Sequence, residues 1–167
     1  MARADRRIQT ALLSLNPTTQ RPAFHGAPSV LGLLRGVTPA TAVWRPHPSM
    51  NNLREISLHV AFWENSVANR LCGQAVRVAF RSRKTGWPTR DDAVAAAPWQ
   101  TECELIRLTH QRLVQVVTDF DPDRLDLPAD PKTGRIAIEL IHGIAEHNLY
   151  HAAQMKMLKL LARHAGS

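Results

Sequence analysis

The sequence is poor in cysteine and in aromatic residues, and it contains no long hydrophobic run. Cysteine occurs only at Cys72 and Cys103, which lack the spacing of metal ligands or of a disulfide framework. No stretch reaches the roughly 18 apolar residues that a membrane span needs, and the first residues lack the apolar centre of a secretory signal. We therefore expect a cytoplasmic protein with reduced thiols and no membrane partner.

Several familiar catalytic motifs are also missing. The sequence has no Gly-x-Ser-x-Gly elbow, no phosphate-binding loop and no dinucleotide fingerprint. A glutamate precedes His147 rather than following it, so the His-Glu-x-x-His pattern of metalloproteases is absent too. The catalytic residues are therefore unknown from sequence alone, and no general base can be named.

The formal net charge of +7 favours anionic partners without identifying them. The densest basic stretch, residues 77–84, has no recognition-helix or base-stacking motif beside it. A solvated helix end and loop is the preferred interpretation, and a nucleic-acid partner is not expected on this basis. A third interpretation, intermediate between a solvated segment and a nucleic-acid patch, is that these arginines attract a small anionic substrate or thiol cofactor.

Apolar residues recur at steps of three and four, and β-alternation persists nowhere, which predicts helices. Short segments are expected at 4–15 and 28–35. Long helices are expected from Asn51 or Asn52 to just before Gly86, from Pro98 to Phe120, and from Thr133 almost to Gly166. Asn52 with Glu55 forms a capping-box pattern, and prolines mark 38–49 and 121–132 as connections. These features predict an all-α four-helix bundle with long connecting loops over 24–165, preceded by an arm or short helix at 1–23.

Two histidines, His147 and His151, stand four residues apart on the apolar stripe of the last helix. Their side chains leave the helix about 40° apart and roughly 6 Å apart along its axis, so both can reach one metal ion. His59 occupies the matching stripe of the first long helix. Three imidazoles with open coordination positions resemble catalytic rather than structural zinc. Histidines satisfied within an ordinary core are the alternative, and His110 is a competing ligand.

Neighbouring residues suggest an open pocket around these histidines. Gly143, one turn before His147, removes side-chain bulk at a cost of about 1 kcal/mol in helix propensity. Gln154 lies on the same face and could orient a histidine or a substrate, although a surface amide is equally consistent. Glu55, one turn before His59, could accept a hydrogen bond from that histidine or serve as a fourth ligand, but capping of the helix is its favoured role. Tyr150 could offer a hydroxyl, or it could serve in packing.

Four segments together resemble the DinB superfamily, and the resemblance covers roughly residues 24 to 162. They are Gly26-Ala-Pro-Ser-Val-Leu, Trp44-Arg-Pro, Glu55-Ile-Ser-Leu-His59-Val-Ala-Phe-Trp63 and His147-Asn-Leu-Tyr-His151-Ala-Ala-Gln154. The resemblance implies a four-helix bundle whose metal ligands fall on His59, His147 and His151. Family members commonly have glycine where Ala153 stands, which changes no ligand.

The same resemblance implies a function. Members of this family carry out transfers and isomerisations that depend on small thiols such as mycothiol, bacillithiol or glutathione, and some act as amidohydrolases. We therefore expect a metal-dependent thiol S-transferase that holds Zn²⁺ or Ni²⁺ and acts on a small-molecule substrate. A metal-dependent hydrolase and a non-catalytic metal- or ligand-binding bundle are the alternatives. By analogy with relatives, a homodimer is expected.

Overall fold

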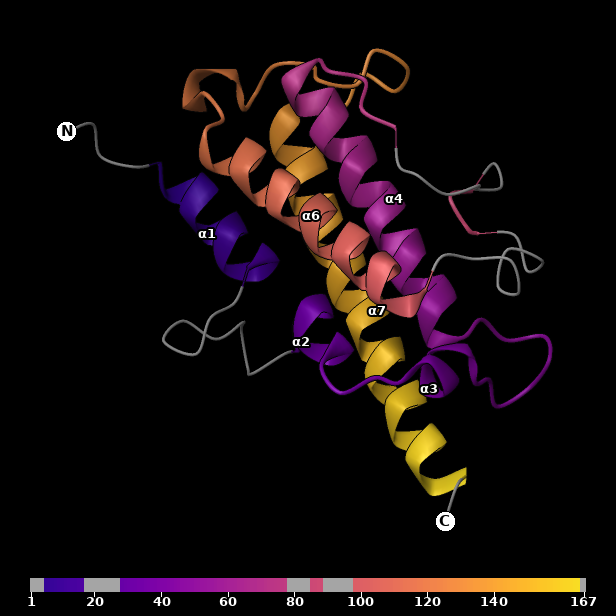
Figure 1. The fold of residues 1–167 in the computed structure, drawn as a ribbon. Helices are drawn as coiled ribbons and strands as arrows, with labels where there is room; N and C mark the ends of the chain where they lie inside the picture. Colours follow the sequence, from indigo (N-terminus) through magenta and orange to yellow (C-terminus); the bar gives the residue numbers. More distant parts are fainter. Residues whose placement is uncertain (1–4, 17–27, 78–84, 89–97, 166–167) are drawn as a thin grey trace.

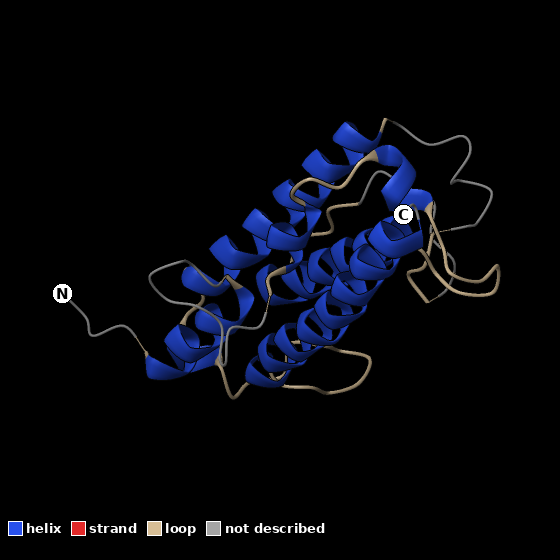
Figure 2. Cartoon of the chain, turned by 90° about the horizontal axis from the view of Figure 1, so that it is seen from below, coloured by secondary structure: helices blue, strands red, loops and turns tan. Residues whose placement is uncertain are grey.

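The computed structural model describes residues 5–16, 28–77, 85–88 and 98–165. Figures 1 and 2 show helices joined by loops, and an isolated β-bridge joins Pro128 to Ile136. The predicted all-α class is confirmed. None of the described helices is long and apolar enough to cross a membrane. The elements are α1 (Arg6–Leu15), α2 (Val30–Leu34), α3 (Pro39–Val43), α4 (Leu53–Cys72), α6 (Trp99–Thr118), a 3-10 turn (Pro122–Arg124) and α7 (Ala137–Ala165).

Helix α4 begins as predicted and ends earlier than predicted. The Asn52 side chain accepts from the Glu55 backbone N–H, and the Glu55 carboxylate accepts from the Asn52 N–H, which is a complete capping box. The helix stops at Gly73, whose φ of 69° lies in the left-handed region. The prediction of a helix reaching almost to Gly86 was therefore wrong.

Helix α7 starts later than predicted because the preceding segment is held in another conformation. Gly134 has a φ of 70°, and Ile136 pairs with Pro128 in the isolated bridge. The backbone carbonyl of Arg135 accepts hydrogen bonds from the N–H groups of Ala129 and Asp130. These bonds keep the chain extended until Ala137, and the prediction of a start near Thr133 was wrong by one turn.

The bundle is formed by α4, α6 and α7 together with two short helices. Both α1 and α2 pack against α6 and α7, and Figure 1 shows them on the same side of the molecule. Ile8, Ala11 and Leu15 of α1 are buried in one core cluster with residues of α6 and α7. The two short helices therefore share the position of one long helix, and residues 17–27 between them lie outside the described part.

Two larger apolar clusters and one small cluster fill the space between the helices, and a polar layer lies between the two larger clusters. On α4, Ile56 and Val60 belong to one cluster and Val67 to the other. On α7, Ala152 belongs to the same cluster as Ile56 and Val60, and Ala145 belongs to the same cluster as Val67. Between these limits lie Glu64 on α4 and His147, Asn148 and His151 on α7, and His59 stands directly before Val60 at the edge of the same layer. Polar side chains are therefore concentrated at one level of the core.

One ion pair ties α4 to α6 away from this layer. Arg54 and Glu102 are only 4% and 5% exposed. The Nε of Arg54 donates to Oε2 of Glu102 at 2.6 Å, and its Nη2 donates to the other carboxylate oxygen. Removal of one partner from such a buried pair leaves a charge without compensation, which destabilises more than replacement of both partners.

We predict that Glu102→Gln lowers the free energy of unfolding by about 3 kcal/mol, while the double substitution Arg54→Met/Glu102→Met lowers it less. Urea denaturation of the three proteins measures both values. Glu104→Gln on the same helix is the matched control, because Glu104 pairs with Arg107 on the exposed surface and should change stability little. Equal effects of Glu102→Gln and Glu104→Gln would contradict the prediction.

Candidate metal centre

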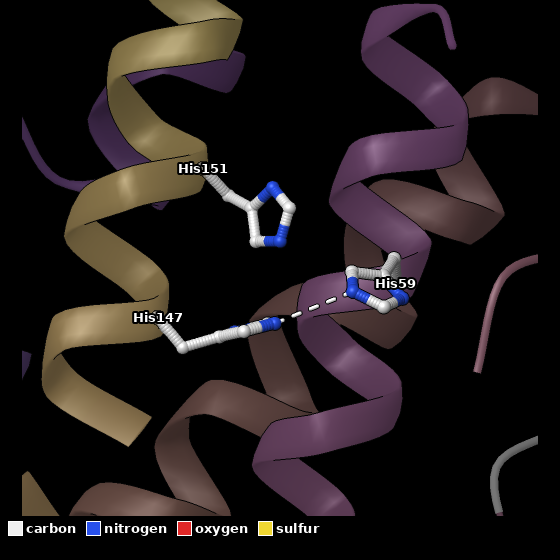
Figure 3. A group of neighbouring side chains, drawn as sticks. All are labelled: His59, His147 and His151. Atoms are coloured by element: carbon white, nitrogen blue, oxygen red, sulfur yellow. Dashed lines mark hydrogen bonds between the residues drawn. The ribbon is translucent and has the colours of Figure 1, made fainter. Parts of the chain in front are cut away.

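Three histidines from two antiparallel helices converge in the polar layer. His59 projects from α4, and His147 and His151 project from successive turns of α7, so that the three rings meet between the helices (Figure 3). One ring nitrogen from each residue lies within 4.8 Å of the other two. The structure therefore brings together the three residues that the sequence predicted as ligands, and as a group they could hold a metal ion.

The spacing of the nitrogens suits a single ion. The Nε2 atoms of His147 and His59 lie 3.3 Å apart. Tetrahedral bonds to zinc of roughly 2.0–2.1 Å hold two nitrogens roughly 3.3–3.4 Å apart. The ligand nitrogen of His151 lies within 4.8 Å of the other two. The donor set and its spacing thus fit a divalent metal that prefers imidazole ligands.

The electrostatics of the layer keep these rings neutral. Burial, helped by the nearby rings of His151 and His147, lowers the pKa of His59 to about 4, although the Gly86 backbone acts in the opposite direction. Burial and the neighbouring His151 lower the pKa of His147 to about 4 as well. Burial also lowers the pKa of His151, against the effect of Gln154. Neutral imidazole is the form that binds metal, so protons compete weakly for this site at neutral pH.

Gln154 supports one of the three histidines directly. Its Oε1 lies 2.7 Å from Nδ1 of His151. When Nδ1 carries the proton and donates it to Gln154, the Nε2 lone pair of His151 faces the shared space. An acceptor behind a histidine fixes its tautomer and ring orientation. Gln154 is therefore in the position that orients a ligand, one turn along the same face of α7.

The other two residues considered as neighbours of the site have different surroundings. The carboxylate of Glu55 accepts from both terminal nitrogens of Arg45 at 2.9 Å, in addition to capping α4. Capping and this ion pair account for its burial. Tyr150 is 62% exposed, and its ring centroid lies 4.9 Å from that of His151. It therefore flanks the outer side of His151.

Trp87 covers the site, and sequence reasoning missed it. The Trp87 ring stacks on His59 with centroids 3.8 Å apart and planes 6° apart. Gly86 makes this approach possible, because its φ is 75° and a Cβ there would lie 2.3 Å from Cδ1 of Phe62. From the sequence, Gly86 indicates only the expected end of the preceding helix. A glycine directly before a tryptophan was the available hint, because glycine can adopt the left-handed backbone that the structure shows here.

His110, the competing histidine, belongs to a separate polar group. Its Nδ1 lies 2.8 Å from Oε1 of Glu64, and the same oxygen accepts from Nδ2 of Asn148 at 2.7 Å. Burial alone would lower the pKa of His110, but its contact with the Glu64 carboxylate raises it. His110 is therefore a satisfied core residue, and the group of three histidines does not include it.

The fold and the site define a class: an all-α bundle with an open three-histidine site in its core. Comparison with known families gives the particular family. The family model of the DinB superfamily matches residues 27–155, which is most of the chain. The chain therefore belongs to the DinB superfamily. A search of curated proteins and a search of solved structures found no significant match.

We predict that the metal-free protein loses stability as the pH falls from 6.5 toward 4. Because the folded-state pKa values of His59 and His147 lie below the usual 6.5, the unfolded chain binds more protons in this window, and acid favours unfolding. Urea denaturation at several pH values measures the slope. The variant His59→Gln/His147→Gln should show a shallower slope than wild type. An identical slope in the two proteins would show that these rings titrate normally.

We also predict that Gln154→Leu weakens metal binding by roughly 10–100-fold, because His151 loses the acceptor that orients it. Competition with a chromophoric chelator measures the affinity. Gln154→Glu is the conservative control, since it keeps an acceptor at the same place and should restore binding. If Gln154→Leu bound metal as tightly as wild type, Gln154 would have no orienting role.

Proposed function

We propose that this protein is a metal-dependent enzyme that transfers a low-molecular-weight thiol to a small-molecule substrate. His59, His147 and His151 would hold the metal, and Zn²⁺ and Ni²⁺ are the candidates because both suit imidazole ligands. The observation that carries the proposal is the convergence of three neutral imidazoles within 4.8 Å in the core. Homodimer formation stays a prediction from the family resemblance.

The number of ligands supports catalysis rather than a structural role. Structural zinc sites are usually closed by four protein ligands, whereas catalytic sites use three and leave a position for substrate. Among the described residues, the group that could share an ion contains three histidines and no carboxylate or thiol. A metal bound there would keep room for one more ligand and would lower the pKa of a thiol or water that occupied it.

The absence of a carboxylate from this group of described residues favours a thiol over water as the nucleophile. A thiol has a pKa near 8.5, so it gives up its proton much more readily than water does. A thiol therefore depends less than water on a nearby carboxylate base to remove its proton. This comparison ranks the transferase above the hydrolase, which uses the same three ligands.

The surrounding residues have separate roles in this proposal. Trp87 stacks on His59 and shields that side of the site from water. Gln154 fixes the ring of His151 by its contact with Nδ1. Trp63 lies with its ring centroid 6.4 Å from those of both His59 and His147, so it offers an apolar surface to a substrate. These contacts orient the ligands and exclude water without taking part in the bond changes.

We predict that wild type binds about one equivalent of Zn²⁺ or Ni²⁺ and conjugates a small thiol to an alkyl halide or epoxide, and that His147→Ala/His151→Ala loses both properties. Elemental analysis after refilling measures the metal, and consumption of free thiol measures turnover. The control His142→Ala/His164→Ala removes two exposed histidines from the same helix and should change neither.

The outcomes separate the candidate functions. Metal binding with turnover of esters or amides in the absence of thiol would favour the hydrolase. Metal binding without turnover of either kind would favour the non-catalytic bundle. Equal metal content in wild type and in His147→Ala/His151→Ala would contradict the site itself.

A further inference from the structure

A cavity of about 420 Å³ opens beside His147, the one member of the three histidines that lines it. His147 and Trp63 stand at one end of its lining, and Gly143 lies one turn along α7 from His147. This volume is within the range of small-molecule sites. A Cβ built on Gly143 meets no atom within 4 Å, so this helix position is open space. The cavity is therefore the space next to the histidines that can hold the body of a ligand.

The lining changes character along α7. After His147 it is apolar, with Ile144 and Leu140, and it becomes charged at Glu139 and Arg135. The ten residue-to-residue steps from Ala137 to His147 extend roughly 15 Å along the helix. A ligand that reaches the histidines would therefore have an apolar middle and a polar far end at the loop before α7.

Three of the four charged groups at the far end already have partners. Arg70 pairs with Asp130 at 3.3 Å and also donates to Ser66. Asp130 accepts further hydrogen bonds from the backbone N–H of Lys132 and the hydroxyl of Thr133. Glu139 accepts from the backbone N–H of Ile136. These bonds occupy the acids and Arg70 within the protein.

Arg135 is different from its neighbours. Its backbone carbonyl is fixed by two hydrogen bonds from residues 129 and 130, while its guanidinium makes no hydrogen bond or ion pair with any residue that the structure describes. The side chain is exposed and lines the cavity. A guanidinium offers two parallel donors that match a carboxylate. Asp130 and Glu139 nearby disfavour a dianion such as phosphate, so a singly charged group fits better.

We propose that the cavity binds an elongated monocarboxylate whose apolar body lies along Leu140 and Ile144 and whose carboxylate contacts Arg135. The end of the ligand away from the carboxylate would lie at His59, His147 and His151, and this part of the proposal rests on the proposed metal function. The contact with Arg135 does not depend on it. Arg135 is then the residue that selects acids over neutral substrates of the same length.

Calorimetric titration of zinc-loaded protein with ω-mercaptohexanoate and with ω-mercaptohexanol tests this selection. The two probes share a thiol and a chain, and they differ only in the terminal group. We expect the acid to bind about ten-fold more tightly, the size of one charge-assisted hydrogen bond. Arg135→Gln should remove the difference, whereas Lys132→Gln, an exposed cation of the same loop outside the lining, should preserve it.

Gly143→Leu tests the cavity separately from its charge. The added side chain enters the open space, so both probes should lose at least ten-fold in affinity, while circular dichroism confirms the fold and elemental analysis confirms the metal. Gly143→Ala is the smaller control and should retain most of the binding. Equal affinity of wild type for the two probes, an undiminished preference in Arg135→Gln, or unchanged binding in Gly143→Leu would each overturn the proposal.

Titration of the metal-free protein with hexanoate distinguishes this proposal from the metal function. Binding of hexanoate that Arg135→Gln abolishes, in a protein that takes up no metal, would support the cavity and contradict the metal site. Metal uptake that depends on the histidines, without any preference for the acid, would leave the metal site in place and overturn the role of Arg135.

Discussion

The structure depends on how it satisfies a layer of polar side chains between two apolar clusters. Buried polar groups are costly unless they find partners. In one half of the layer, Oε1 of Glu64 contacts both His110 and Asn148, while Oε2 of Glu64 and Oδ1 of Asn148 are buried without a hydrogen bond from a described residue. The three convergent histidines form the other half, and apart from Gln154 they mainly face one another (Figure 3). A cation bound to one nitrogen of each ring could serve as a shared partner for all three.

The surroundings give this site one closed side and one open side. The flat contact between Trp87 and His59 closes the side toward residues 85–88, and Gly86 is needed for the chain to pass over Phe62. The cavity lies on the other side, where Gly143 leaves space beside His147. In the proposed function, a substrate would therefore approach along α7. Both ligand-bearing helices are long and packed on each other, so the histidines stand on rigid elements.

The helices and their inner faces could be predicted from the sequence, but their ends were harder to place. The three-four spacing put His59, His147 and His151 toward the core, where the structure has them. Gly73 ends α4 and Gly134 delays α7 because both adopt left-handed backbone, and a continuing apolar pattern concealed these local signals. The stacking of Trp87 on His59 joins residues on different elements, and no periodic pattern encodes such a contact.

The sequence by itself determined which side of each helix is polar or apolar, because local hydrogen bonds fix the angle between successive side chains on one helix. Tertiary structure alone decided that His59 lies level with His147 and His151, and that Arg135 shares a cavity with His147. The axial position of α4 against α7 depends on many small packing contacts, such as that of Ser57 with Met155. These contacts form between distant residues, so no short stretch of sequence specifies them.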